Sequence, residues 1–362
     1  MALELRNVTR RIGDETHIAD ATLTFEADAI NVLLGPTLSG KTTLLRLMAG
    51  LDRPSSGSIV MDGKDVTGVS VRRRDVAMVY QQFINYPNLT VYENIASPLR
   101  VAGRPRAEID ATVRGTAELL KLAPLLDRMP LELSGGQQQR TALARALAKG
   151  ARLLLLDEPL ANLDYKLREE LREELPRLFA ETGAIFVYAT TEPSEALLLG
   201  GRTAALHQGH IVQFGPTLDV FRQPNSLIAA QTFSDPPMNT VAVTKKDGRV
   251  DMGAGLAIAA TGGLAGVGDG SYTVGFRANH LKIERPPGDV VAVSATVAIT
   301  EISGSESFVH VDFAGQRWVA LAHGIHEFVP GAPIEVFLDP GRFFVFDRTG
   351  RLAAAPVAAA AA

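Results

Sequence analysis

The chain has 362 residues, of which 46% are hydrophobic and 21% charged, and it carries a net charge of −4 and no cysteine. This length predicts two or three domains with ample core, the lack of cysteine fits a reducing compartment, and the acidic balance argues against nucleic-acid binding. The N-terminus lacks a signal-peptide pattern, and the longest uncharged stretch, 252–267, is too short and glycine-rich to span a bilayer. We therefore expect a soluble, cytoplasmic chain without a nucleic-acid partner.

The first 50 residues predict strands that lead into a loop and a helix. Residues 1–34 alternate polar and apolar side chains around a turn at Gly13 and Asp14, which predicts short antiparallel strands. The apolar run 30–34 predicts a buried strand, and residues 42–49 predict a helix that ends at Gly50.

Between that strand and that helix lies a phosphate-binding loop. Its pattern is Gly, four residues, Gly-Lys and then Ser or Thr, and the predicted nucleotide-contacting residues are Gly35, Pro36, Thr37, Leu38, Ser39, Gly40, Lys41, Thr42 and Thr43. The glycines let backbone N–H groups surround the β- and γ-phosphates, and the helix N-terminus adds its positive dipole end. Lys41 is expected to bridge the phosphates and Thr42 to place a hydroxyl on Mg²⁺. A chance glycine-rich turn would explain the pattern too, but the strand, loop and helix follow one another in register.

Residues 51–150 predict two strands and then a helical region. The strands are expected near 59–61 and at 76–80, the second ending at Gln81. Three helices are expected at 93–100, 106–122 and 137–149.

A predicted capping box precedes the last of these helices. Ser134 and Gln137 match its pattern, while Gly135 and Gly136 clear side chains from the helix N-terminus and create a second phosphate-facing surface. A well-capped helix with no further role is the alternative, although capping alone asks for only one small residue.

Two carboxylates end the next predicted strand, 153–156. Asp157 is expected to hold Mg²⁺ and Glu158 to polarise an attacking water as general base, because α/β sheets place chemistry at the carboxyl ends of their strands. A surface turn is the plain alternative. Further strands at 185–188 and 203–207, with helices between them, predict a parallel sheet covered on both faces.

The pattern of apolar residues along the sequence changes around 233–237. From 241 to 346, short valine-rich runs with glycine turns predict a small all-β barrel or sandwich, and the alanine-rich tail 353–362 is expected to be frayed. The predicted domains are therefore 1–234, with a helical subdomain at about 88–150, and 235–352.

These segments together resemble the ATPase subunits of ABC transporters. Residues 35–42, 133–137 and 153–158 look like Walker A, signature and Walker B, 162–164 resembles the D-loop, and Gln81 with 86–91 resembles the Q-loop of maltose and sn-glycerol-3-phosphate importers. Residues 236–239, 275–277 and 304–306 resemble the OB-type (TOBE) regulatory domain of that carbohydrate branch. The resemblance implies an α/β fold, namely a P-loop ABC ATPase domain with a helical subdomain, followed by a C-terminal all-β OB-type domain.

In that family, two ATPase subunits pair head to tail around ATP and Mg²⁺. The resemblance therefore implies that Ser134, Gly135, Gly136, Gln137 and Asp164 serve nucleotides at the subunit interface. It also implies that Gln81 links the Mg²⁺ site to the helical subdomain, whose surface receives a membrane permease subunit. Phe83, Ile84 and Tyr86 either line that contact or belong to the core. A periplasmic or lipid-anchored solute-binding protein would act indirectly, with the chain peripheral on the cytoplasmic face of the inner membrane.

Three positions depart from the family pattern. Thr191 stands where the family has a His that contacts the γ-phosphate, Ile12 stands where it has an aromatic residue that stacks on adenine, and Leu38 lies in a loop that favours small residues. Losing one preorganised donor to a developing charge typically costs about 10²–10³ in rate. His207 and His210 flank a predicted turn and offer no obvious substitute.

The resemblance thus implies an ATP-hydrolysing subunit of an importer for a carbohydrate or polyol, such as glycerol or sn-glycerol-3-phosphate. Pairing with a second, regular ATPase subunit is favoured over a homodimer, because both sites of a homodimer would carry the departures. A weakly active or inactive regulatory partner is the alternative. A soluble ABC ATPase of translation or DNA repair would need a second ATPase domain or a long coiled-coil insertion, and this sequence has neither.

Overall fold

The computed structural model describes residues 1–27, 29–161 and 163–356, and the chain divides into two compact units, Met1–Leu218 and Asp219–Ala362. No helix in the described ranges combines the length and the apolar character needed to cross a membrane.

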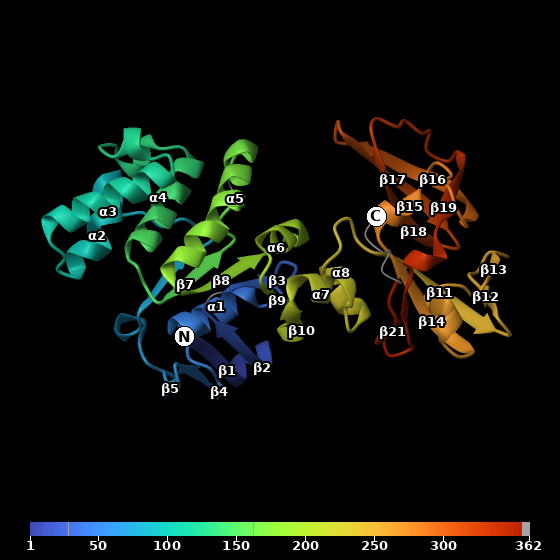
Figure 1. Ribbon diagram of the computed structural model, residues 1–362, viewed down its shortest axis with the longest axis horizontal. Coiled ribbons are helices and arrows are strands. Elements are labelled where there is room, and N and C mark those ends of the chain that lie inside the picture. Colours follow the sequence, from blue (N-terminus) through green and yellow to red (C-terminus); the bar gives the residue numbers. More distant parts are fainter. Residues whose placement is uncertain (28, 162, 357–362) are drawn as a thin grey trace. The chain divides into compact units, whose positions relative to one another are not determined.

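A six-stranded sheet forms the centre of the N-terminal unit (Figure 1). Its order is β10-β9-β3-β8-β7-β6, and all neighbours are parallel except β10, which pairs antiparallel with β9 at one edge. The predicted parallel sheet is confirmed, with this antiparallel edge strand in addition. The strands are β3 (Ile30–Leu34), β6 (Val76–Val79), β7 (Leu153–Asp157), β8 (Ile185–Thr190), β9 (Arg202–His207) and β10 (His210–Pro216).

The two faces of this sheet are covered by different elements. On one face, helix α1 (Lys41–Ala49) and a four-stranded antiparallel sheet share a core that includes Phe25, Leu45 and Val187. On the other, helix α5 (Tyr165–Thr182) stacks Phe179 on Phe186, with ring centroids 3.9 Å apart. Successive strand residues point to opposite faces, which is why Phe186 and Val187 face different layers. The antiparallel sheet, predicted at the N-terminus, contains β1 (Ala2–Ile12), β2 (Glu15–Glu26), β4 (Ser56–Met61) and β5 (Lys64–Asp65).

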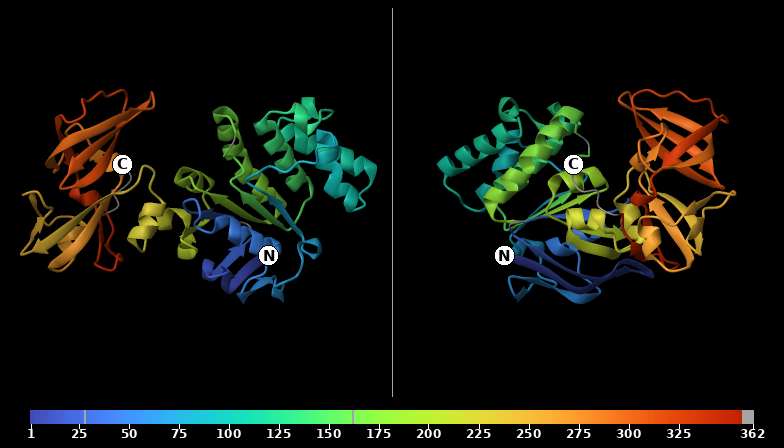
Figure 2. Two further views of the ribbon diagram at one scale, coloured as in Figure 1. Left: turned by 180° about the vertical axis from the view of Figure 1, so that it is seen from behind. Right: turned by 45° about the vertical axis from the view of Figure 1, so that its right-hand side comes forward.

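Three helices form a group of their own in the N-terminal unit (Figures 1 and 2). Helix α4 contacts the edge strand β6 and packs with the other two. It begins at Gly135, ahead of the predicted start at Gln137, because Ser134 is its N-cap. The group consists of α2 (Val91–Val101), α3 (Arg106–Leu119) and α4 (Gly135–Ala148), and the unit also contains α6 (Pro193–Leu199). Single 3₁₀ turns lie at Val71–Arg73, Ala123–Leu125 and Pro130–Glu132.

The C-terminal unit contains two antiparallel sheets around an aromatic core, which confirms the all-β prediction. Trp318 is fully buried against Phe276 and Phe313. One sheet, in spatial order, contains β13 (Ala257–Ala259), β12 (Arg249–Asp251), β11 (Asn239–Lys246), β14 (Gly270–Phe276), β20 (Phe344–Phe346) and β21 (Leu352–Ala354). The other contains β15 (Leu281–Lys282), β19 (Pro333–Leu338), β16 (Val291–Ile302), β17 (Glu306–Phe313) and β18 (Gln316–His323). Short helical segments are α9 (Gly263–Gly266) and the 3₁₀ turns Ala278–His280 and Pro340–Arg342.

The structure places two boundaries differently from the sequence-based division. The compact units divide after Leu218, within α7 (Thr217–Arg222), and not at 234, because α8 (Leu227–Thr232) packs Ala230 against Phe344 and Phe346. Ala353 and Ala354 are not a frayed tail: they complete β21, where Ala354 pairs with Val345. Residues 357–362 of the predicted tail lie outside the described residues.

Candidate nucleotide site

The predicted phosphate loop runs from the end of β3 to the start of α1, and close packing requires its glycines. Gly40, the N-cap of α1, has φ +106°, and a Cβ there would lie 2.7 Å from Ile18 Cδ1. A Cβ on Gly35 would lie 2.5 Å from the carbonyl oxygen of Leu206. Ser39 Oγ is buried and has no hydrogen-bond partner among the described residues. The loop is thus a tight cradle that contains an unpaired hydroxyl.

Lys41 lies beneath this loop. Its side chain is 5% exposed, and Nζ donates hydrogen bonds to the carbonyl oxygens of Gly35 (2.7 Å) and Pro36 (3.1 Å). Nζ also lies 3.8 Å from Glu158 Oε1. Burial lowers the pKa of Lys41, and the negative charges of Glu158 and Asp157 act in the opposite direction. The loop geometry therefore fixes one cationic group beside two carboxylates.

Thr42 and Asp157 form a hydrogen-bonded pair of oxygen ligands. Thr42 Oγ1 donates to Asp157 Oδ2 at 2.8 Å, and burial raises the pKa of Asp157. Hydroxyl and carboxylate oxygens suit Mg²⁺, which usually takes one or two protein carboxylates and completes its shell with water and substrate phosphates. No group of three or more His, Cys, Asp or Glu side chains capable of holding a metal occurs in the described part of the chain.

Glu158, directly after β7, is held in an unusual backbone conformation. Its φ is +48°, and its N–H donates to the carbonyl oxygen of Ala189 on β8 at 2.9 Å. Gln81, after β6, donates from Nε2 to Glu158 Oε2 at 2.9 Å. A non-glycine residue with positive φ carries a cost of about 1–3 kcal/mol and tends to occur at functional sites. Residues from three strand ends thus meet at one place.

A cavity of about 610 Å³ lies over the phosphate loop. The predicted residues that line it are Thr37, Leu38, Ser39, Gly40, Lys41, Thr42, Thr43, Gln81 and Glu158. Five lining residues were missed by sequence reasoning: Glu15, Thr16, His17, Gln208 and Gly209.

Tertiary packing brings the missed residues to the loop. The Gly209 N–H donates to the carbonyl oxygen of Ser39 at 2.9 Å. A Cβ on Gly209 would lie 2.7 Å from the carbonyl oxygen of His17. The tight turn at Gln208 and Gly209 is readable from sequence as a turn, but nothing local in the sequence ties it to the phosphate loop.

Two of the three departing positions, Ile12 and Thr191, lie outside the cavity lining, whereas Leu38 is part of it. Ile12 is 52% exposed at the end of β1, where it pairs with Glu15 across the hairpin turn. The residues that line the cavity come after this turn, at 15–17, and Ile12 is not among them. Thr191 is exposed directly after β8. Its neighbour Thr190 accepts a hydrogen bond from the Gly35 N–H at 3.3 Å, which keeps this segment next to the phosphate loop. Leu38 is 95% exposed with φ +67°.

The predicted signature residues form the capping box of α4 and lie outside the cavity lining. The Gln137 N–H donates to Ser134 Oγ at 3.4 Å, and the Ser134 N–H donates to Gln137 Oε1 at 2.9 Å. Gly135 and Gly136 form the first turn of the helix. The carbonyl oxygen of Asp164 accepts from the Arg168 N–H at 2.9 Å, whereas Asn162 of the predicted D-loop lies outside the described residues.

Comparisons with known proteins give the following matches. A family model described as "ABC transporter" matches residues 18–161. The chain is 37% identical to the trehalose/maltose import ATP-binding protein MalK of Thermococcus litoralis and 34% identical to the sn-glycerol-3-phosphate import ATP-binding protein UgpC 3 of Rhizobium etli; each match covers 96% of this chain and 98% of the relative. The spermidine/putrescine import ATP-binding protein PotA of Pseudomonas aeruginosa is 44% identical over 69% of this chain and 70% of its own length. A dimeric post-hydrolysis structure of the ATP-binding cassette MJ0796 bound to ADP and Pi matches with a TM-score of 0.55 and 29% identity, covering 59% of this chain and 98% of that one.

Proposed function

The chain belongs to the ATP-binding subunits of ABC importers, and from this premise we propose that it hydrolyses Mg-ATP to drive uptake of a carbohydrate or polyol such as glycerol or sn-glycerol-3-phosphate. The assignment to this class of solute rests on how much of the chain each relative matches. The sugar and glycerol-phosphate relatives match across both units, whereas the polyamine relative matches over 69% of the chain.

Each residue of the site has a proposed role that follows from its chemistry. Lys41 and the loop N–H groups bind the phosphates, and Glu158 orients the attacking water and accepts its proton. Gln81 holds the Glu158 carboxylate in place through its hydrogen bond. Mg²⁺, when bound, neutralises phosphate charge, and Thr42 and Asp157 are the residues that would hold it, with Gln81 nearby. Thr191 is the proposed hydrogen-bond donor to the γ-phosphate in place of His.

The membrane partner is proposed to dock on a groove beside the helical group. This groove, about 490 Å³, is lined by Met78, Leu89 and Val101 together with Tyr86 and Arg145, whose guanidinium lies 4.8 Å from the Tyr86 ring centroid. Ile84 and Tyr86 are exposed, so a contact surface is favoured over a core role for these two residues. Phe83 is half-buried. We place the chain on the cytoplasmic face of the membrane, peripheral, with a solute-binding protein acting on the other side.

Fractionation tests this docking. The chain expressed alone should remain in the soluble fraction, and the chain co-expressed with its permease should sediment with membranes. Sedimentation in the absence of any partner would contradict attachment through a protein.

Two ATPase subunits are proposed to pair, and the intact signature residues favour a heterodimer with a regular ATPase. In a mixed dimer, this chain would lend Ser134 to Gln137 to a complete site on its partner, whereas a homodimer would carry Thr191 and Ile12 at both sites. The second candidate function, a weakly active regulatory partner, is favoured by the exposed positions of Ile12 and Thr191 outside the cavity. MJ0796 was solved as a dimer.

Rates of ATP hydrolysis separate these candidates. The purified chain should hydrolyse ATP slowly, and the partner should raise turnover above the sum of the separate rates. Thr191→His should raise the rate of the chain alone by up to about 10²-fold, if the missing donor limits the reaction. Fast hydrolysis by the chain alone that does not respond to Thr191→His would contradict the heterodimer argument.

A further inference from the structure

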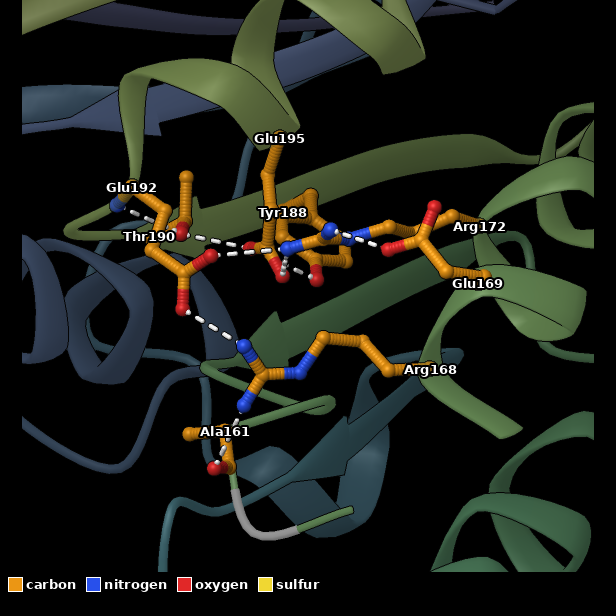
Figure 3. Close-up of polar contacts among 8 residues, drawn as sticks. All are labelled: Ala161, Arg168, Glu169, Arg172, Tyr188, Thr190, Glu192 and Glu195. Atoms are coloured by element: carbon orange, nitrogen blue, oxygen red, sulfur yellow. Dashed lines mark hydrogen bonds and ion pairs between the residues drawn. The ribbon is translucent and has the colours of Figure 1, made fainter. Parts of the chain in front are cut away.

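A cluster of polar and charged side chains joins helix α5 to the end of β8, outside the nucleotide cavity (Figure 3). We call it the loop-linking cluster, and its members are Arg168, Arg172, Tyr188, Thr190, Glu192 and Glu195. None of these residues lines the cavity.

Glu195 anchors the cluster. Its carboxylate is 4% exposed and accepts hydrogen bonds from Tyr188 Oη (3.0 Å), Thr190 Oγ1 (2.6 Å) and Arg172 Nη2 (3.2 Å). A buried carboxylate is stable only when its oxygens are well partnered. Three donors, one of them cationic, meet that requirement and fix the end of β8 against α5 and α6.

Glu192 connects this anchor to a second loop. Its carboxylate accepts from Arg172 Nη2 at 2.7 Å and from Arg168 Nη1 at 3.1 Å. Arg168 Nη2 donates to the carbonyl oxygen of Ala161 at 3.0 Å. Because a guanidinium is a rigid fork with several donors, the single side chain of Arg168 holds the loop after β7 and the loop after β8 together, as Figure 3 shows.

These two loops carry the proposed reactive groups. Glu158 begins the first loop, and the Ala161 N–H donates back to the Glu158 carbonyl oxygen at 3.3 Å. Thr191 lies in the second loop between Thr190 and Glu192, whose N–H donates to Thr190 Oγ1 at 3.0 Å. Thr190 in turn accepts from Gly35 of the phosphate loop. A displacement at Glu192 therefore has a short covalent and hydrogen-bonded route to both reactive groups.

We propose that Arg168 and Glu192 are positioning residues for ATP hydrolysis, which set the separation of the two loops and thereby the placement of Glu158 and Thr191. The inference rests on the hydrolysis proposed above. Neither residue contacts the cavity, so their removal lowers the rate of hydrolysis and leaves ATP affinity in place. Displacing reacting groups by about 1 Å can cost up to about 10²-fold in rate.

Substitutions in the full-length chain test this role, with Glu169→Gln as the matched control. Glu169 accepts from Arg172 at 2.6 Å but bonds to neither loop in the described structure. ATP affinity, thermal unfolding and single-turnover ATP hydrolysis with protein in excess are measured for Glu192→Gln, Arg168→Met, Arg168→Lys and the double variant Arg168→Met/Glu192→Gln. Glu192→Gln keeps the size of the side chain, so it tests the proposal even if Arg168→Met does not fold.

The expected pattern separates positioning from binding and from folding. Glu192→Gln and Arg168→Met each slow hydrolysis by about 10-fold or more, with ATP affinity within about twofold of the parent. Arg168→Lys keeps the charge but cannot hold both acceptors, so its rate of hydrolysis should lie between those of the parent and of Arg168→Met. The double variant is no slower than the slower single variant, because both remove one linkage. Glu169→Gln behaves like the parent.

Several results would overturn the inference. These are an equal loss of rate in Glu169→Gln, additive losses in the double variant, and a loss of ATP affinity that matches the loss of rate. Hydrolysis by the parent together with unchanged rates in all variants rejects the positioning role alone. A parent that binds ATP but never hydrolyses it, even with its partner, rejects the proposed function.

Discussion

Each unit of the chain buries one lysine among backbone carbonyls, and the two lysines are used differently. In the C-terminal unit, Lys245 is 7% exposed, and its Nζ donates to the carbonyl oxygens of Leu264 (2.8 Å), Ala265 (3.4 Å) and Val267 (2.6 Å). An ammonium has three N–H donors, so the backbone satisfies Lys245 completely.

Lys41 is as deeply buried, yet its surroundings differ in two respects. Its Nζ donates to two carbonyl oxygens, not three, and it lines a cavity beside Glu158. A buried cation whose donors are all used by its own backbone stabilises the fold, whereas one with remaining capacity toward a cavity can bind an anion. The comparison therefore predicts that removing each lysine changes a different measured property.

Lys41→Ala should produce the largest effect, on binding. Loss of a buried charge-assisted contact to phosphate is expected to weaken ATP affinity by at least about 10²-fold, with the fold intact, as measured by calorimetric titration and circular dichroism. Lys41→Ala with unchanged ATP affinity would reject the assignment of the phosphate loop.

Lys245→Met should instead change stability. Three carbonyl oxygens, of which that of Leu264 is in a buried hydrogen bond and the other two are in partly buried ones, lose their donor. We therefore expect the free energy of unfolding of the C-terminal unit to fall by about 2–3 kcal/mol, measured by chemical denaturation. ATP affinity should remain within about twofold of the parent. The control is Lys246→Met, because Lys246 is the next residue of β11 and is exposed on the opposite face of the strand. Weaker ATP binding in Lys245→Met would break the distinction between the two lysines.

The sequence predicted the parts of the site that consecutive residues create. The phosphate loop, the acids that end β7 and the capping box at Ser134 and Gln137 all depend on local chemistry, such as glycine at positive φ or a side-chain oxygen that caps a helix. The same holds for the parallel sheet, because strands and helices alternate along the chain.

The parts that tertiary structure creates were not readable from the sequence. His17 and Gly209 reach the cavity because the hairpin β1–β2 and the turn after β9 pack on the phosphate loop, and no local pattern records that contact. The position of Ile12 could not be deduced either, since a one-residue displacement along a hairpin changes which side chain borders the loop. The linkage from Arg168 to Ala161 and Glu192 likewise exists only once α5 lies across the sheet.

The smallest expected effect is a pH dependence confined to the C-terminal unit, and it comes from His280. Burial, together with the positive charges of Arg277, Arg342 and Lys282, lowers the pKa of His280 to about 4, and its Nδ1 is buried without a hydrogen-bond partner among the described residues. Because the pKa in the folded state is below the unfolded value of about 6.5, the neutral form is favoured by folding. Its contribution to stability is therefore complete above about pH 6.5 and is lost as the pH falls toward 4.

Comparison of unfolding free energies at pH 7 and pH 4.5 measures this effect. The shift corresponds to a limit of about 3 kcal/mol, and since His280 is only partly buried by surface area, we expect about 1–2 kcal/mol after allowance for solvent screening. His280→Gln should remove this part of the pH dependence, whereas His323→Gln, at an exposed position, should keep it. Other carboxylates titrate in the same range, so the difference between variant and parent is the relevant quantity. Equal pH dependence in the parent and in His280→Gln would show that this histidine does not couple protonation to folding. A change of ATP affinity in His280→Gln would contradict the separation of binding and stability between the two units.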